Sequence, residues 1–337
     1  MQKILIDGSF VDKKVTGVQR FCWEVFSELY KQAKDYIAIA IPKSVDVNLL
    51  KDYDCEIIQY GNKNNKIWQF FTLGKIAKRY KYNLLCMSNL DPLFKKDYLV
   101  LHDVTFLEKE GNNNKLWALK YKIFVSLNIY KHKKIFTVSN FSKSRILNYY
   151  PKLKEEDVIV CGNGYSQLSN EQSTLKYKDF FLSVGSSSNN KNFKYILELA
   201  KANPNSQFII TGKIYGDFFE QANKIKNLKM LGYVSNTDLK YLYKNCNAFI
   251  LPSTYEGYGL PPLEAVSCGC KKLFLSNIPP FKEIYGDVAT FFEPLEYDKL
   301  VNLESGFKIS EENAKILLSK NNWTRTAKII LEGVDLK

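Results

Sequence analysis

Histidine is scarce in this sequence, and cysteine follows no pattern. The 337 residues include only two histidines, and the seven cysteines are scattered and odd in number. Such scatter does not fit a disulfide framework. Cys268 and Cys270 are separated by one residue, which is shorter than the spacing of a zinc knuckle. We therefore expect reduced thiols that serve packing, with no bound metal and no cofactor.

Long apolar runs are also missing. No stretch reaches the ~18 apolar residues of a membrane-spanning helix, and the short run from Tyr36 to Ile41 ends at Pro42. The N-terminus lacks the long apolar region and the cleavage site of a secretory signal. These absences favour a cytoplasmic protein without a spanning segment.

Positive charge is in excess and unevenly distributed. The formal net charge is +13, and residues 1–165 carry 27 basic against 17 acidic side chains, a net +10. We therefore expect the N-terminal half to face an anion. Nucleic acid, an anionic membrane surface and a phosphorylated substrate would each satisfy this expectation, and net charge alone does not choose among them.

The length suits two domains of about 150 residues each. In both halves, short apolar runs of strand type alternate with longer segments of helical period, the pattern of parallel sheets covered by helices. Residues 166–179 are polar and have neither period. We predict a linker there, between an N-terminal domain over 1–165 and a C-terminal domain over 180–337 whose final helix can pack back toward the first.

The alternation defines the individual elements. Strands are expected over residues 3–6, 37–41, 56–59, 98–101, 134–138, 158–160, 180–184, 208–211, 229–231, 248–251, 272–275 and 290–292. Helices are expected over residues 17–33, 67–80, 114–130, 142–149, 194–203, 237–244 and 262–267. Ligands of such α/β sheets bind beyond the carboxyl ends of the strands, so we look for the site there.

The most informative segment, residues 251–269, is typical of a strand, a loop and a helix. Pro261 and Pro262 suit the first helical turn, where an amide proton would have no partner, and Gly269 suits the helix exit. The start of this helix is the positive end of its dipole. The segment therefore predicts a place where backbone amides meet an anion.

Two glutamates flank the loop before this helix. Glu256 and Glu264 enclose seven residues, and Gly257 and Gly259 allow the backbone to approach a ligand. The string resembles the signature of the family 4 glycosyltransferases of GT-B fold, in which two glutamates surround a Gly-Phe-Gly-Leu-Pro core. Here Tyr258 replaces the phenylalanine. The resemblance implies two Rossmann-like domains whose parallel sheets face a central cleft.

The resemblance also implies an activity. A family member is a retaining, metal-independent glycosyltransferase that moves a hexose or deoxyhexose from a nucleotide-diphosphate sugar. Glu256 would hold the hexose hydroxyls, and Glu264 the ribose hydroxyls. No further carboxylate of the motif is an evident nucleophile, which favours front-face displacement, with Lys191 stabilising the leaving diphosphate.

Further donor-binding residues follow from the same resemblance. Asn190 stands where many members have arginine, so phosphate contact would depend more heavily on Lys191. Backbone near the strand ends would contact the diphosphate and the base. The donor-binding positions implied in this domain are Gly185, Lys191, Gly212, Tyr233, Val234, Gly257, Tyr258, Gly259, Leu260 and Glu264.

In the N-terminal half, Thr16 and Gly17 resemble the glycine loop of the family, where amides approach the donor phosphates. His102 and Asp103 resemble its His-Asp pair at a strand end, so His102 would face the reacting sugar and Asp103 the acceptor. With Glu256 and Lys191, His102 completes the implied catalytic set. A lone histidine is otherwise more often structural.

The acceptor is expected to be lipid-linked or a glycan, in surface polysaccharide (including lipopolysaccharide) or glycolipid biosynthesis. Residues 66–81 and 115–134 combine aromatics with lysines, a composition typical of membrane-surface helices but also of core helices with a basic face. Together with the charge of the first half, they favour a peripheral protein on the inner face of the cell membrane.

Other interpretations stay open. A nucleic-acid-binding protein would explain the positive charge but not the paired glutamates Glu256 and Glu264. An epimerase or a non-catalytic partner subunit would keep the fold and change the chemistry. Asp52 and Asp54 form a spaced pair that could hold a divalent cation against a diphosphate.

Overall fold

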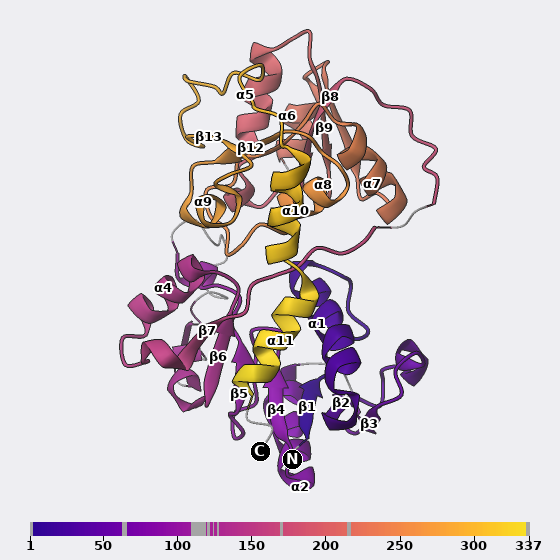
Figure 1. Cartoon of the computed structure of the whole chain (residues 1–337), viewed down its shortest axis with the longest axis vertical. Coiled ribbons are helices and arrows are strands. Elements are labelled where there is room, and N and C mark those ends of the chain that lie inside the picture. Colours follow the sequence, from indigo (N-terminus) through magenta and orange to yellow (C-terminus); the bar gives the residue numbers. More distant parts are fainter. Residues whose placement is uncertain are drawn as a thin grey trace. The chain divides into compact units, whose positions relative to one another are not determined.

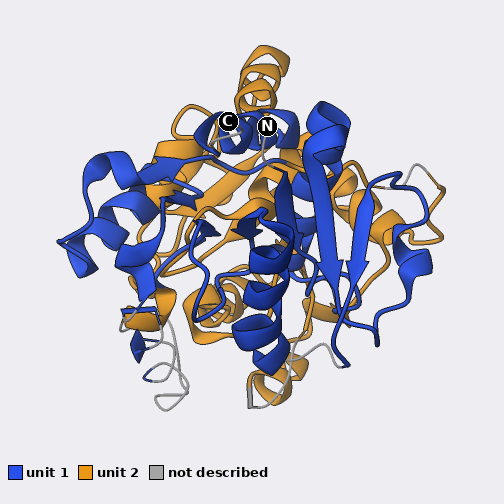
Figure 2. Cartoon of the chain, turned by 90° about the horizontal axis from the view of Figure 1, so that it is seen from below, with its two compact units in different colours: residues 1–104, 116–164, 321–337 blue, residues 105–115, 165–320 orange. Residues whose placement is uncertain are grey.

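The computed structural model describes residues 3–62, 66–108, 119, 122–123, 125–126, 128–168, 171–213 and 217–334. The chain divides into two compact units (Figure 2). Unit 1 consists of residues 1–104, 116–164 and 321–337, and unit 2 of residues 105–115 and 165–320. Each unit contains one sheet in which every neighbouring pair of strands is parallel. The predicted α/β class with two Rossmann-like units is therefore confirmed.

Unit 1 is built on a seven-stranded sheet with the order β3-β2-β1-β4-β5-β6-β7. The central strands are buried on both faces because helices connect parallel strands across the sheet. Its strands are β1 Ile4–Asp7, β2 Ile37–Ile41, β3 Glu56–Gln59, β4 Asn83–Cys86, β5 Tyr98–Val100, β6 Lys134–Thr137 and β7 Val158–Val160. Its helices include α1 Gly17–Ala33, α2 Leu73–Tyr80, α4 Asn140–Tyr149 and α11 Trp323–Gly333 (Figure 1).

Unit 2 is built on a six-stranded sheet with the order β10-β9-β8-β11-β12-β13. Its strands are β8 Phe180–Val184, β9 Gln207–Thr211, β10 Leu228–Gly232, β11 Ala248–Leu251, β12 Leu273–Ser276 and β13 Thr290–Phe292. Its helices include α5 Lys194–Ala202, α6 Asp217–Asn223, α7 Asn236–Asn245, α8 Leu260–Ser267, α9 Pro279–Tyr285 and α10 Glu311–Lys320. Short 3-10 turns occur at Lys34–Tyr36, Val47–Leu50, Thr105–Leu107, Ile129–Lys131, Glu155–Asp157 and Asn189–Lys191.

The last helix of the chain packs in unit 1. The side chain of Gln32 on α1 donates a hydrogen bond of 3.1 Å to the backbone carbonyl of Thr324, whose hydroxyl donates to Glu28 at 2.8 Å. Trp323 meets Phe21 edge to face, with ring centroids 5.7 Å apart. These contacts join α11 to α1, beside which it lies in Figure 1.

The observed elements differ from the predicted ones in three respects. β4 was not predicted because its four residues directly follow a helix, too few to display either apolar period. The predicted helix over 67–80 begins with a π-helical turn, Trp68–Thr72. Helices α6, α9 and α10 were also missed, since they are short or largely polar. The predicted helix over 114–130 lies mostly outside the described residues.

Two serines and a glycine cap helix ends, and Gly269 was predicted in this role. The hydroxyl of Ser139 accepts a hydrogen bond from the backbone amide of Ser142 at the start of α4. Ser235 accepts from the amide of Asp238 at the start of α7. Gly269 follows the last residues of α8 with a φ of +94°, the left-handed conformation that ends helices.

Candidate functional site

Two loops of unit 2 lie side by side because β8 and β11 are neighbours in the sheet. Residues 185–193 follow β8, and residues 252–259 follow β11. The backbone amide of Thr254 donates to the carbonyl of Asn190 at 2.8 Å, and the side-chain amide of Asn190 donates to the carbonyl of Tyr255 at 3.2 Å. Asn190 thus joins the two loops where the resemblance would have placed an arginine.

The joined loops bring Lys191 against Glu256. The Lys191 Nζ lies 2.6 Å from the Glu256 Oε1, and the hydroxyl of Ser253 donates to the same oxygen at 2.7 Å. The side chains of Lys191 and Glu256 are 17% and 11% exposed. The pair is therefore poorly screened by water, yet it is within reach of a ligand.

Helix α8 begins immediately after these loops. Gly259 precedes its first residue with a φ of +90°, and a Cβ there would lie 2.4 Å from the ring of Phe281. The buried hydroxyl of Tyr285 donates to the Gly259 carbonyl. Burial raises the pKa of Tyr285 well above its ordinary value, so the phenol remains a donor. These contacts fix the helix start, where the dipole favours an anion.

Glu264 lies one turn inside α8. Its side chain is buried, and the hydroxyl of Tyr243 on α7 donates to its Oε2 at 3.3 Å. A buried carboxylate is costly unless polar groups contact it. Glu264 is therefore no solvated helix-start charge, and its conformation is set by α7 packed against α8.

Glycines allow the ends of β8, β9 and β10 to approach closely. Gly212 has a φ of +127°, and a Cβ there would lie 1.9 Å from the carbonyl oxygen of Gly185. The Gly212 amide donates to the carbonyl of Gly232 at 2.7 Å. Tyr233, 73% exposed, and Val234 follow at the same end of the sheet. The predicted donor residues of unit 2 thus come from the carboxyl ends of four neighbouring strands.

The remaining predicted site residues belong to unit 1. Gly17 is the first residue of α1, and His102 follows β5. The His102 Nε2 lies 2.9 Å from the carbonyl oxygen of Met87, and its ring meets Phe21 of α1 edge to face at 4.6 Å. Asp103 is half-buried. His102 is therefore held by the helix that Gly17 begins.

Burial lowers the pKa of His102 below its usual value of 6.5. The imidazole is therefore neutral near pH 7. A backbone carbonyl only accepts hydrogen bonds, so the Nε2 carries the proton and the Nδ1 is an acceptor. A neutral ring beside a reacting sugar would not oppose the positive charge that develops there.

No group of three or more histidine, cysteine or acidic side chains suited to a metal occurs within the described part of the chain. Asp54 is 90% exposed and pairs with Lys34 at 3.0 Å. All seven cysteines are free thiols. Among the described residues, no helix has the length and the apolar composition needed to cross a bilayer.

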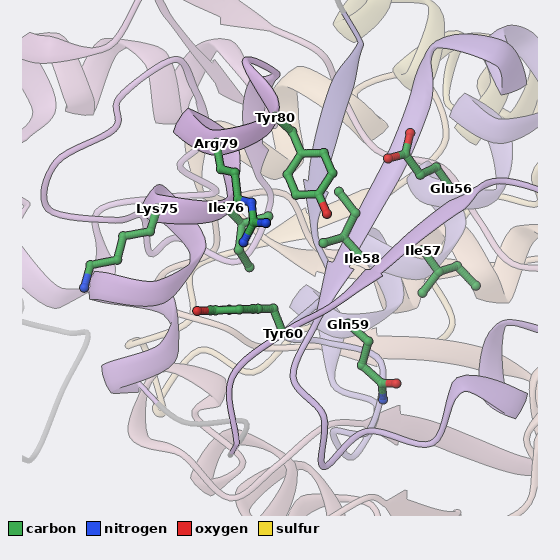
Figure 3. Close-up of a pocket in the computed structure, with 9 residues that line it drawn as sticks. All are labelled: Glu56, Ile57, Ile58, Gln59, Tyr60, Lys75, Ile76, Arg79 and Tyr80. Carbon is green, nitrogen blue, oxygen red and sulfur yellow. The ribbon is translucent and has the colours of Figure 1, made fainter.

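A cavity of about 250 Å³ lies between β3 and α2 in unit 1 (Figure 3). Tyr60, Arg79 and Tyr80 line it together with Ile58 and Ile76. A second cavity, of about 460 Å³, borders the β8 loop in unit 2. It is lined by Ser187, Ser188, Asn189, Asn192, Phe193, Lys194, Phe218, Thr254, Leu295 and Tyr297. Neither cavity contains Glu256 or Glu264.

Several residues of the site were not predicted from the sequence. Ser253, Tyr243 and Tyr285 each donate a hydrogen bond to a group of the predicted loop or helix. A tyrosine on the buried side of a helix is typical of a core residue, and serine after a strand is typical of a turn. Of these three residues, only Ser253 could have been suspected from the sequence, because it lies three residues before Glu256.

Residues 166–303 match the family described as Glycosyl transferases group 1. The O-antigen chain mannosyltransferase B of Escherichia coli is 29% identical over 189 residues, which cover 50% of this chain and 49% of that protein. The chain thus spans about half the length of this relative. The O-antigen chain mannosyltransferase RfbU of Salmonella typhimurium is 26% identical over 76% of this chain and 74% of its own.

The fold also matches solved structures over the full chain. The crystal structure of Anabaena Alr3699/HepE in complex with UDP and glucose has a TM-score of 0.68, with 15% identity and 100% of each chain covered. At this identity the likeness concerns the fold alone. The chain has the GT-B fold class, with a seven-stranded and a six-stranded parallel sheet.

Proposed function

We propose that this protein is a retaining glycosyltransferase that transfers a hexose or deoxyhexose from a nucleotide-diphosphate sugar to a lipid-linked or glycan acceptor. The observation that carries the proposal is the contact of Lys191 with Glu256, 2.6 Å apart at the carboxyl ends of two parallel strands. A cation for a diphosphate and a carboxylate for sugar hydroxyls lie together there. The two O-antigen mannosyltransferases among its relatives support a role in surface polysaccharide biosynthesis.

The donor would extend along the strand ends of unit 2. Tyr233 and Val234 would contact the base, and Glu264 would accept hydrogen bonds from the ribose. The diphosphate would meet backbone amides at the start of α8. These belong to the loop of Gly257 and Tyr258 and to Gly259 and Leu260, which lead into the helix. Gly185 and Gly212, which follow β8 and β9, would contact the diphosphate through their backbone.

The reaction would proceed by front-face displacement. As the bond between the sugar and the diphosphate breaks, Lys191 and the start of α8 would stabilise the departing charge. The leaving phosphate would take the proton of the acceptor hydroxyl. Glu256 would hold the hexose, and neutral His102 would face it. Gly17 would add an amide to the diphosphate, and Asp103 would contact the acceptor.

Positive charge from Lys191 and backbone amides makes a metal ion unnecessary in this mechanism. The exposed basic side chains of α2 would hold unit 1 at an anionic membrane surface, as a peripheral protein on the cytoplasmic side. No contact with nucleic acid is proposed.

The test is turnover of a panel of UDP-, GDP- and dTDP-sugars with membrane lipid extract as acceptor, in EDTA. We expect release of nucleoside diphosphate and a product whose anomeric configuration, assigned by NMR, equals that of the donor. Glu256→Gln should abolish most of this turnover. Inversion of the configuration would refute the retaining mechanism, and turnover that requires Mn²⁺ would refute metal independence.

A further inference from the structure

Lys191 and Glu256 neutralise each other in this structure. The ammonium is 2.6 Å from the Glu256 Oε1, and Ser253 donates to that same oxygen. Ser253 is fully buried and stands two residues after the end of β11. Both contacts, from Lys191 and from Ser253, therefore go to the same carboxylate oxygen, Oε1. The carboxylate is thus anchored through Oε1, and a ligand hydroxyl would donate to Oε2.

The same two side chains have separate partners in the proposed function. Lys191 would bind the diphosphate, and Glu256 would bind the hexose hydroxyls. When Lys191 turns to a phosphate, Glu256 loses its cation in a place that is only 11% exposed. An unpaired charge in such a place is costly.

A bare nucleoside diphosphate compensates only half of this exchange, because it offers an anion to Lys191 and nothing to Glu256. The intact nucleotide sugar offers the anion and, in addition, hydroxyl donors for the Glu256 carboxylate. The free energy needed to separate the pair therefore weakens binding of the product. For the substrate, the contacts of its sugar with Glu256 offset this free energy.

We propose that the Lys191–Glu256 pair, positioned by Ser253, is a specificity element that favours the intact sugar donor over the free nucleoside diphosphate. The inference rests on the proposed function and adds to it. During turnover, loss of the sugar restores the contact of Lys191 with Glu256 and thereby promotes departure of the nucleoside diphosphate. Ser253 acts as a positioning residue, since it holds the carboxylate while Lys191 is away.

Calorimetry with two pairs of probes, UDP with UDP-glucose and GDP with GDP-mannose, tests the proposal. Glu256→Gln keeps the shape of the side chain and removes its charge. We expect this variant to bind the bare nucleoside diphosphate about three- to tenfold more tightly than the wild type, the scale of a lost ion-pair interaction. The preference for the sugar donor over the diphosphate should shrink in parallel.

Two further variants separate this mechanism from simple charge repulsion. Glu198→Gln removes a carboxylate of the same unit that pairs with exposed Lys201, and it should change neither affinity. Ser253→Ala changes no charge and leaves Glu256 more dependent on Lys191. We therefore expect it to weaken the bare diphosphate, the opposite sign from Glu256→Gln. Melting temperatures establish that each variant is folded.

The outcomes are distinguishable. An unchanged or weaker diphosphate affinity in Glu256→Gln would overturn the proposal while leaving the proposed function intact. If Glu256→Gln bound the bare diphosphate more tightly and Ser253→Ala had no effect, charge repulsion alone would explain the result. The proposed exchange of partners would then be contradicted. If the wild type bound none of the four probes, the donor specificity and the proposed function would both be contradicted for these nucleotides.

Discussion

The hydroxyl of Tyr243 donates a hydrogen bond of 3.3 Å to the Oε2 of Glu264, and both side chains are buried between α7 and α8. The phenol orients the carboxylate that would accept hydrogen bonds from the ribose hydroxyls. Removal of this donor should therefore be felt by any ligand that carries the ribose, with or without a sugar attached.

Tyr243→Phe is expected to weaken a bare nucleoside diphosphate and its sugar donor equally, by about 0.5 to 1.5 kcal/mol, the net value of one hydrogen bond. Glu264→Gln should cost both ligands about 1 to 3 kcal/mol, because a charged hydrogen bond is lost. Isothermal calorimetry measures both. Tyr241→Phe is the matched control, since Tyr241 lies on the same helix and donates to Tyr177. An effect of Tyr243→Phe on the sugar donor alone would refute the ribose assignment.

Gly212 should tolerate no side chain. Its Cβ would lie 1.9 Å from the carbonyl oxygen of Gly185, and its φ of +127° is unfavourable for any other residue. We expect Gly212→Ala to separate β8 from β9 and to lower the free energy of unfolding by several times the effect of Gly269→Ala.

Gly269 is the matched control, because its φ is +94° but nothing lies within 4 Å of its Cβ position. The strain of a left-handed residue alone should cost Gly269→Ala about 1 to 2 kcal/mol. Urea denaturation compares the two variants. Equal losses in the free energy of unfolding would show that the backbone at Gly212 and Gly185 can move apart without destabilising the fold.

Most of the strands could be expected from the alternation of apolar runs and helical segments, but their order in the sheets and the site contacts could not. Lys191 and Glu256 are 65 residues apart, and their contact depends on β8 and β11 being neighbours. A run of apolar residues predicts a strand without naming its neighbour. The resemblance supplied both residues, while the ion pair between them came only from the structure.

Residues that position others were the least predictable. Tyr243 and Tyr285 look like core residues, because their rings are buried and only the hydroxyl reaches the site. The sequence indicated only that Asn190 replaces an arginine and leaves phosphate contact more to Lys191, whereas the structure shows its side chain and carbonyl joining two loops. Such roles depend on single hydrogen bonds across the fold, and these leave no period in the sequence.

His102 makes stability depend on pH. Burial lowers its pKa below 6.5 in the folded state. Between neutral pH and pH 5.5, the unfolded chain therefore binds more protons at this histidine than the folded chain does. Stability from this residue is therefore full above pH 6.5 and declines as pH falls through that window.

The measurement is the free energy of unfolding in urea at pH 7.5 and 5.5, for the wild type and for His102→Gln, which can still donate to the Met87 carbonyl. The wild type should lose up to about 1 kcal/mol more than the variant on acidification. A wild type that became relatively more stable at pH 5.5 would mean that His102 is protonated in the fold.

Association with anionic vesicles should weaken as salt rises, because exposed charges act over a Debye length of about 8 Å at physiological ionic strength. Lys75, Lys78 and Arg79 are exposed on α2, and Phe71 and Phe94 are exposed beside each other, with ring centroids 6.3 Å apart. Replacing the three cations by glutamine should reduce sedimentation with phosphatidylglycerol vesicles.

The control for the vesicle experiment removes the same charge elsewhere, at Lys308, Lys315 and Lys320, which are exposed in unit 2. This triple variant should sediment nearly as the wild type does. Equal binding to neutral and anionic vesicles at every salt concentration would remove the electrostatic argument for a membrane-facing α2.

The central claim is that the strand ends of unit 2 bind a nucleotide-diphosphate donor through Lys191 without a metal. Its most direct test is a calorimetric titration of UDP, GDP and dTDP, in EDTA, into the wild type and Lys191→Met, which keeps the length of the side chain and removes its charge. The account predicts one-to-one binding of at least one nucleotide by the wild type, and an affinity at least about tenfold lower in the variant, the loss of a charged contact to phosphate. Equal affinities of the two proteins, or binding only after Mn²⁺ is added, would contradict it.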